Sequence, residues 1–261
     1  MELDLKGKTA IVTGPAKGMG AAITLALAKE GVDLCLAGRD MDAIAPVFSE
    51  VKNLGRRVIQ AQCDVTDAAQ VQKVVDQTVK AFGRIDILVN VAGGRGPLET
   101  TAWETTPEAF DEVVELNMKG CFLTMRAVTP VMQKQGSGKI VNIGGTFGLR
   151  GRALRMGYSA SKWGLRGITK AFALELGPYN VNVNNVCPGM VDGPRFRKVC
   201  EGMAKRLGIT EEEAIRKHAE EYALKRVSTD QDIANAVLFY ASDVSRQITG
   251  QDIAVDGGWV I

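Results

Sequence analysis

A tyrosine and a lysine stand four residues apart in the stretch YSASK, as Tyr158 and Lys162. Residues at i and i+4 share one face of a helix, so a helix here would bring the ammonium beside the phenol. A positive charge at that distance stabilises the phenolate and makes the tyrosine a usable proton donor and acceptor near neutral pH. The pair therefore predicts proton transfer to or from a substrate oxygen.

A glycine-rich stretch near the start of the chain, TGPAKGMG, predicts a nucleotide site. Gly14, Gly18 and Gly20 follow an apolar run and open a segment of helical character. Glycines there let the backbone approach a pyrophosphate, and the free N–H groups of a helix start favour its negative charge. Lys17 and Met19 lie in the same turn and are predicted to contact the cofactor with it.

Both motifs need a frame, and the pattern of apolar runs predicts one. Runs of strand length occur at residues 9–13, 33–37, 57–62, 86–90, 139–143, 181–186 and 252–255. They lack strict alternation, as parallel strands covered on both faces do, and segments of helical periodicity separate them. We expect one domain over residues 1–261, a three-layer doubly wound α/β fold with seven mostly parallel strands.

A charged, helical excursion at about residues 190–225 follows the sixth strand. Ligands of such sheets bind at the carboxyl ends of the strands, so the excursion is predicted to be a substrate lid. A helical surface decoration is the alternative.

Four motifs in order and spacing resemble the short-chain dehydrogenase/reductase family of the single-domain type. They are the GxxxGxG turn, NVAGG after the fourth strand, YSASK, and CPGMVDG after the sixth strand. The resemblance covers essentially the whole chain and implies a Rossmann fold, a nicotinamide cofactor, and interconversion of a secondary alcohol and a ketone. It also implies a homotetramer, with VDGGWVI as a subunit contact.

The resemblance assigns roles to residues of this chain. Tyr158 would exchange the proton, Lys162 would also hold the nicotinamide ribose, and Asn117 in ELNMKG would secure a relay water. Further cofactor contacts are expected at Asp64, Val65, Asn90, Ala92, Gly93, Pro188, Gly189 and Val191. Gly193 stands where many relatives carry a threonine that binds the carboxamide, and the backbone of Val191 is expected to replace that contact.

The end of the second strand, LAGRD, bears on the choice of cofactor. Gly38 stands where NAD-type relatives carry an aspartate, and Arg39 follows it. With Lys17 it offers two positive charges to a 2′-phosphate, which predicts NADP. Asp40 could bind a ribose hydroxyl instead, so NAD is the alternative.

The stretch before Tyr158 departs from the family. Relatives carry a serine thirteen residues before the tyrosine, and here that position is Gly145, with Gly144 before it. Thr146 is the nearest hydroxyl, although a shift of one position would need a bulge to turn its side chain into the site. Three outcomes stay open: Thr146 substitutes, the substrate or a loop supplies the donor, or turnover is weak. A weakened regulatory or scaffold protein, and a dehydratase or epimerase on the same fold, are therefore competing functions.

Arginines gather in the loops expected at the mouth of the pocket. They are Arg95, Arg150, Arg152, Arg155, Arg195 and Arg197. Guanidinium groups bind carboxylate, sulfonate and phosphate in a bidentate manner, so a small anionic substrate is predicted, with Arg95, Arg152, Arg155 and Arg195 as its contacts. Solvated loop arginines or subunit contacts are the alternative.

The bulk composition excludes several classes of protein. A net charge of +2 and a charged content of 24% imply no concentrated basic face for nucleic acid. The five cysteines are scattered and His218 is the one histidine, so no metal site is expected. No apolar run is long enough to cross a membrane and no signal peptide is evident, which makes the cytoplasm the expected location.

Overall fold

The computed structural model describes residues 2–260, apart from the side chain of Arg195. Its seven strands form one sheet in the order β3-β2-β1-β4-β5-β6-β7, and every adjacent pair is parallel. The strands are β1 (Thr9–Thr13), β2 (Asp33–Gly38), β3 (Val58–Gln62), β4 (Ile87–Asn90), β5 (Gly138–Ile143), β6 (Val181–Pro188) and β7 (Asp252–Val255). Each predicted run agrees with a strand to within two residues at either end, and the predicted fold class is confirmed.

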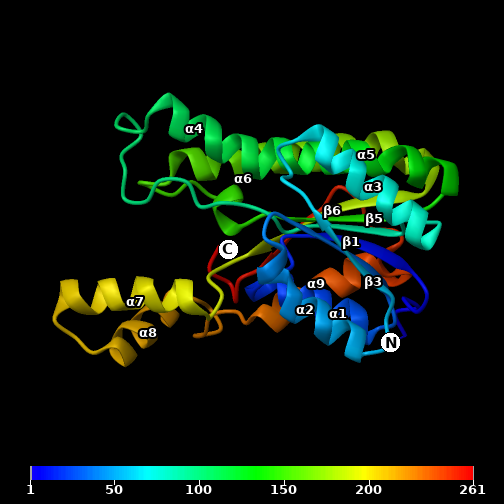
Figure 1. Ribbon diagram of the computed structural model, residues 1–261. Helices are drawn as coiled ribbons and strands as arrows, with labels where there is room; N and C mark the ends of the chain where they lie inside the picture. The colour runs from blue at the N-terminus through cyan, green and yellow to red at the C-terminus, as the bar shows by residue number, and fades with distance from the viewer. Residues whose placement is uncertain (1, 261) are drawn as a thin grey trace.

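Helices cover both faces of this sheet (Figure 1). One face carries α1 (Gly18–Lys29), α2 (Met41–Asn53) and α9 (Asp230–Ala241). The other carries α3 (Ala68–Phe82), α4 (Pro107–Val114), α5 (Gly120–Gln135) and α6 (Met156–Leu176). The remaining pair, α7 (Pro194–Leu207) and α8 (Glu211–Ala219), follows β6 and stands beyond the carboxyl ends of the strands.

Burial explains why the strand sequences are almost continuously apolar. One core cluster joins the sheet to α1, α2 and α9 through residues such as Ile23, Leu34 and Val237. A second cluster joins it to α3, α5 and α6 through residues such as Leu88 and Met125. A strand covered on both faces needs apolar side chains on both, and the polar ones that it buries, such as Asn142, are hydrogen-bonded.

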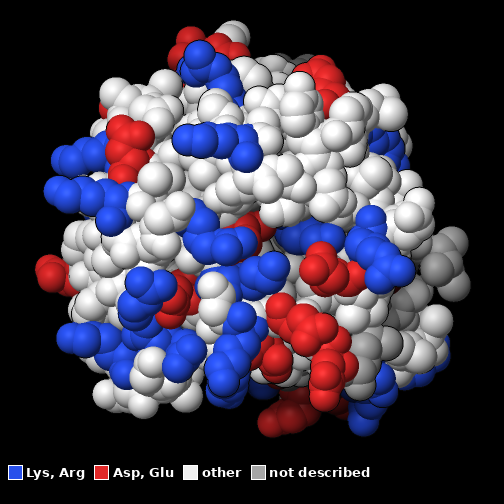
Figure 2. Space-filling model, turned by 90° about the vertical axis from the view of Figure 1, so that its right-hand side faces the viewer, with Lys and Arg blue, Asp and Glu red and all other residues white. Residues whose placement is uncertain are grey.

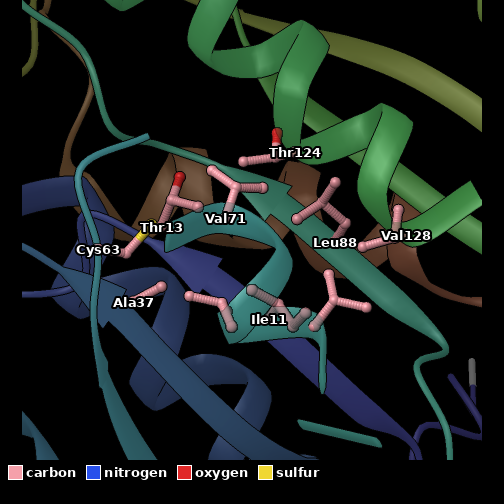
Figure 3. Close-up of a pocket in the computed structure, with 10 residues that line it drawn as sticks. Ile11, Thr13, Ala37, Cys63, Val71, Leu88, Thr124 and Val128 are labelled. Atoms are coloured by element: carbon pink, nitrogen blue, oxygen red, sulfur yellow. The ribbon is translucent and has the colours of Figure 1, made fainter. Parts of the chain in front are cut away.

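A small cavity lies between the sheet and helices α3 and α5 (Figure 3). Its volume of about 10 Å³ is room for about one water, so it is no ligand site. Cys63 lines it, and burial raises the pKa of this thiol to about 11, which keeps it protonated. The cysteine is therefore a packing residue rather than a nucleophile.

The face opposite α7 and α8 carries mixed charge (Figure 2). Basic and acidic side chains are interspersed over it, without a field of one sign. Within the described residues, no helix is both long enough and apolar enough to cross a membrane.

Candidate active site

The glycine-rich turn between β1 and α1 fits a pyrophosphate. A Cβ on Gly20 would lie 2.1 Å from the carbonyl oxygen of Gly14, and a Cβ on Gly14 would lie 3.0 Å from the backbone of Ala92. No side chain caps α1, because its N-cap residue is Lys17 and makes no capping hydrogen bond. The first N–H groups of the helix are therefore open to an anionic group, which is the requirement for a phosphate site.

Residues around the predicted 2′-phosphate site lie at the ends of β2 and β3. Arg39 is 74% exposed and its guanidinium stands 4.0 Å from the carboxylate of Asp64. Hydrogen bonds from the backbone N–H and hydroxyl of Thr66, with a smaller contribution from Arg39, hold the pKa of Asp64 below its ordinary value. Asp40 instead accepts a hydrogen bond from the N–H of Ala43 and caps α2.

The predicted catalytic pair lies at the start of α6. Tyr158 is in the first turn and Lys162 in the second, so the two share the face predicted from their spacing. Lys162 is buried, its Nζ lies 5.8 Å from the centroid of the Tyr158 ring, and it donates a hydrogen bond of 2.8 Å to the carbonyl oxygen of Ile143. The lysine thus connects the catalytic helix to the end of β5.

Asn117 lies in a π-helical turn, η1 (Glu115–Lys119), between α4 and α5. Its Oδ1 accepts a hydrogen bond from the N–H of Gly94 at 2.8 Å, and its Nδ2 donates to the oxygen of Gly94 at 3.0 Å and to Ser161 Oγ at 3.1 Å. These bonds tie the loop after β4 to the catalytic helix. Such π-turns interrupt a helix and frequently occur at functional sites.

Asn90 serves the centre of the sheet. It donates a hydrogen bond of 2.9 Å to Asn142 on β5 and accepts one of 2.7 Å from Thr124 on α5. Asn142 in turn donates to Thr169 on α6 at 3.0 Å. This buried network joins β4 and β5 to α5 and α6. Asn142 lies two residues before Gly144, the first glycine of the turn after β5.

The turn after β5 brings Gly145 opposite Tyr158. A Cβ on Gly145 would lie 3.2 Å from Tyr158 Oη, so residue 145 is at the position where the family places its serine. Pairing with β6 continues through Ile143, and Gly144 N–H donates to the oxygen of Val186 at 2.7 Å, so regular pairing reaches the turn. Thr146 follows in a short 3-10 helix, η2 (Thr146–Gly148), and is buried.

Aromatic rings extend from Tyr158 toward the excursion. Phe147 contacts Tyr158 with a centroid distance of 6.2 Å and Trp259 with one of 5.7 Å, and Trp259 stacks on Tyr222 at 5.3 Å. Trp259 Nε1 also donates to the carboxylate of Glu221 at 3.0 Å. We call Tyr158, Phe147, Trp259 and Tyr222 the aromatic row; it links the catalytic helix to the end of the 190–225 excursion.

Three of the predicted arginines lie on this row. The guanidinium carbon of Arg155 is 5.0 Å from the Tyr158 centroid, that of Arg152 is 5.9 Å from Phe147, and that of Arg150 is 4.7 Å from Trp259. Arg155 also donates to the backbone oxygen of Arg95 at 2.9 Å, so the loop after β4 that carries Arg95 lies beside Arg155.

The 190–225 excursion carries two of the predicted arginines, Arg195 and Arg197. Arg197 forms an ion pair with Asp192, with a shortest distance of 3.2 Å, and its charge is therefore partly neutralised. The side chain of Arg195 lies outside the described part of the structure.

Sequence reasoning missed the aromatic row beyond Tyr158. Phe147, Trp259 and Tyr222 belong to different parts of the chain, so no local signal places them together. Trp259 lies in VDGGWVI, which the family resemblance assigned to a subunit contact, and within this chain it packs on Phe147 and Tyr222. The same holds for Ser161, although it lies within YSASK, because its partner Asn117 is 44 residues away.

Comparisons with known proteins agree with this geometry. The family model described as Enoyl-(Acyl carrier protein) reductase matches residues 14–260. The 3-oxoacyl-acyl-carrier-protein reductase of Thermotoga maritima is 36% identical, with 98% of this chain and 99% of the relative covered. The structure of NAD+-bound xylitol dehydrogenase is 30% identical with a TM-score of 0.91, covering 98% of this chain and 100% of its own. That of an actinorhodin polyketide ketoreductase with NADPH is 31% identical with a TM-score of 0.89, covering 97% of each chain.

Proposed function

This chain belongs to the short-chain dehydrogenase/reductase family of NAD(P)-dependent oxidoreductases, and we propose that it interconverts a secondary alcohol and a ketone with NADP as the preferred cofactor. The observation that carries the proposal is the placement of Tyr158 and Lys162 on one face of α6, with position 145 directly opposite the Tyr158 hydroxyl. A substrate oxygen between them would meet a proton donor and a stabilising positive charge.

The residues of the proposed site have separate roles in the reaction. The glycine turn and the open end of α1 hold the dinucleotide, which supplies or accepts the hydride when bound. In the direction of reduction, Tyr158 donates its hydroxyl proton to the oxygen of the ketone, and in oxidation it takes the proton from the alcohol. Lys162 stabilises the tyrosinate in both directions. Asn117 holds the loop at Gly94 against α6, and the relay water remains its predicted second role.

The preference for NADP rests on the charges at the end of β2. The side chain of Arg39 is 74% exposed, with the carboxylate of Asp64 4.0 Å from its guanidinium, and Lys17 is exposed at the start of α1. Asp40 already caps α2, which weakens the case for a ribose contact there. Both observations favour a 2′-phosphate over a free hydroxyl.

The arginines on the aromatic row favour a small anionic substrate. Arg150, Arg152 and Arg155 gather on neighbouring rings at the catalytic tyrosine. We place the substrate acid there, with the excursion as its lid. Regular strand pairing reaches Gly144 without a bulge, so the role of Thr146 as the donor that replaces the serine hydroxyl stays a prediction. The homotetramer and the cytoplasmic location that the family resemblance and the sequence imply belong to the same proposal.

The test compares matched substrates. Oxidation or reduction of the nicotinamide is followed by its absorbance with a panel of anionic and neutral alcohols and ketones, in the wild type, Tyr158→Phe and Arg152→Ala. We expect Tyr158→Phe to lose roughly 100-fold or more in turnover, as removal of a general acid does. Persistent turnover in Tyr158→Phe would contradict the mechanism. No turnover on the whole panel would favour the regulatory function, and equal effects of Arg152→Ala on anionic and neutral substrates would remove the anionic class.

A further inference from the structure

The turn opposite Tyr158 is rich in glycine. It contains Gly144, Gly145 and Gly148, and glycine loses more conformational freedom on ordering than any other residue. Its own hydrogen bonds run from Gly148 N–H to the oxygen of Gly145 at 2.8 Å, and from the N–H groups of Leu149 and Arg150 to that of Thr146 at 2.9 and 3.0 Å. These bonds shape the turn, whereas its distance from α6 depends on contacts with other elements.

Helix α6 supplies such contacts at both ends of the turn. Lys162 donates to the carbonyl oxygen of Ile143, just before the turn, and Arg166 Nη1 donates to that of Gly148, at its end, each at 2.8 Å. Tyr158, Lys162 and Arg166 are spaced by four residues, so one face of the helix presents the proton donor and both supports.

Arg166 is itself fixed from the neighbouring strands. Its Nε donates to Asp252 Oδ2 on β7 at 3.0 Å, and the other oxygen of that carboxylate accepts from Asn185 on β6 at 3.0 Å. Lys170 donates to Oδ2 as well, at 2.8 Å, but its second bond goes to the oxygen of Gly250 rather than to the turn. Asp252 is almost fully buried, and the strand register places it beside Asn185.

We propose that Arg166, held by Asp252, is a positioning residue that sets the distance between the glycine turn and the Tyr158 hydroxyl. The pair acts through the backbone of Gly148, to which Arg166 donates its hydrogen bond. The effect on turnover rests on the proposed function, since it matters only if a substrate oxygen binds between the turn and Tyr158. In a chain with a glycine in place of the serine, the backbone position of the turn also decides where Thr146 lies.

The experiment pairs two substitutions that remove one cation each from the same carboxylate. Arg166→Met removes the bond to the turn, whereas Lys170→Met leaves it intact. We expect Arg166→Met to lower kcat by roughly 10- to 100-fold, the effect of misplacing a reacting group by a fraction of an ångström to one ångström, with the KM for the cofactor unchanged. Lys170→Met keeps the kcat of the wild type, and Arg166→Lys, which retains one charged donor, recovers part of the loss.

Hydrogen exchange measures how firmly the turn is held, and this measurement does not depend on turnover. Peptides that cover residues 144–150 are expected to exchange faster in Arg166→Met and in Asp252→Asn, and at the wild-type rate in Lys170→Met. If Arg166→Met does not fold, Asp252→Asn carries the comparison with both readouts. A kcat and an exchange rate in the Arg166 or Asp252 variants equal to those of Lys170→Met overturn the proposal. A wild type without turnover whose variants still differ in exchange overturns the proposed function and leaves the positioning intact.

Discussion

Gly148 packs against the backbone of α6, and a single methyl group added there tests how closely the turn approaches the helix. A Cβ on Gly148 would lie 2.9 Å from the carbonyl oxygen of Lys162 and 3.0 Å from both its carbonyl carbon and its Cβ. Ordinary contact begins at 3.4 Å, so the turn or the helix must retreat by roughly 0.5 Å in Gly148→Ala. None of these three atoms is the flexible end of a side chain, so the backbone has to move.

The expected effects follow from that displacement. Overpacking of this size lowers the free energy of unfolding by ~1–3 kcal/mol. For a chain of this length each kcal/mol lowers Tm by about 2–4 °C. Because the turn faces the Tyr158 hydroxyl, we also expect kcat to fall roughly 10-fold. Thermal unfolding and the nicotinamide absorbance assay measure the two effects on the same preparation.

Gly151 provides the control within the same loop. A Cβ on Gly151 meets nothing within 4 Å, so Gly151→Ala should leave both Tm and kcat close to the wild type. If Gly148→Ala and Gly151→Ala behave alike, the close contact between the turn and α6 does not exist in the protein, and the reasoning about the turn fails with it.

Three further predictions concern the cofactor site and the buried carboxylate. Arg39→Ala should raise the KM for NADP about 10-fold, as loss of one charge-assisted contact does, and leave the KM for NAD unchanged; equal changes for both would contradict the NADP preference. Gly20→Ala should abolish cofactor binding in a fluorescence titration, because its Cβ would lie 2.1 Å from the oxygen of Gly14. Burial alone would raise the pKa of Asp252, but hydrogen bonds from Lys170, Asn185 and Arg166 hold it below its ordinary value. The ionised carboxylate therefore stabilises the fold above the ordinary pKa, and this stabilisation is lost as the pH falls through the lowered pKa. In urea unfolding, the difference in free energy of unfolding between wild type and Asp252→Asn should narrow below about pH 4. A difference that stays constant with pH would contradict this.

The local patterns were sufficient to predict the frame of the site. Strand β1 was predicted with the same bounds as observed, since a fully buried parallel strand is a short apolar run between turn residues. The count of thirteen residues back from Tyr158 also identified Gly145, and the structure places that residue against the Tyr158 hydroxyl. Both inferences depend only on the order of the residues along the chain, which can be read from the sequence.

Contacts between distant segments could not be predicted in this way. Arg166 and Asp252 are 86 residues apart, and their pairing depends on β7 lying next to β6 in register. Ser161 and Asn117 are likewise 44 residues apart, and their hydrogen bond depends on η1 and helix α6 lying side by side. The charge of a side chain is visible in a sequence, whereas the partner that uses this charge is set by the tertiary fold.

The regular spacing on α6 limits which changes of chain length this helix can accept. Tyr158, Lys162, Arg166 and Lys170 lie within thirteen residues, with about 18 Å of helix between the first and the last. Insertion or deletion of one residue between the first and the last would rotate every later group by about 100° around the helix axis and remove it from its partner. We therefore expect a change of length between residues 158 and 170 to separate these groups from their partners, whereas the loop at residues 149–155, which leads into the helix, lies outside this constraint.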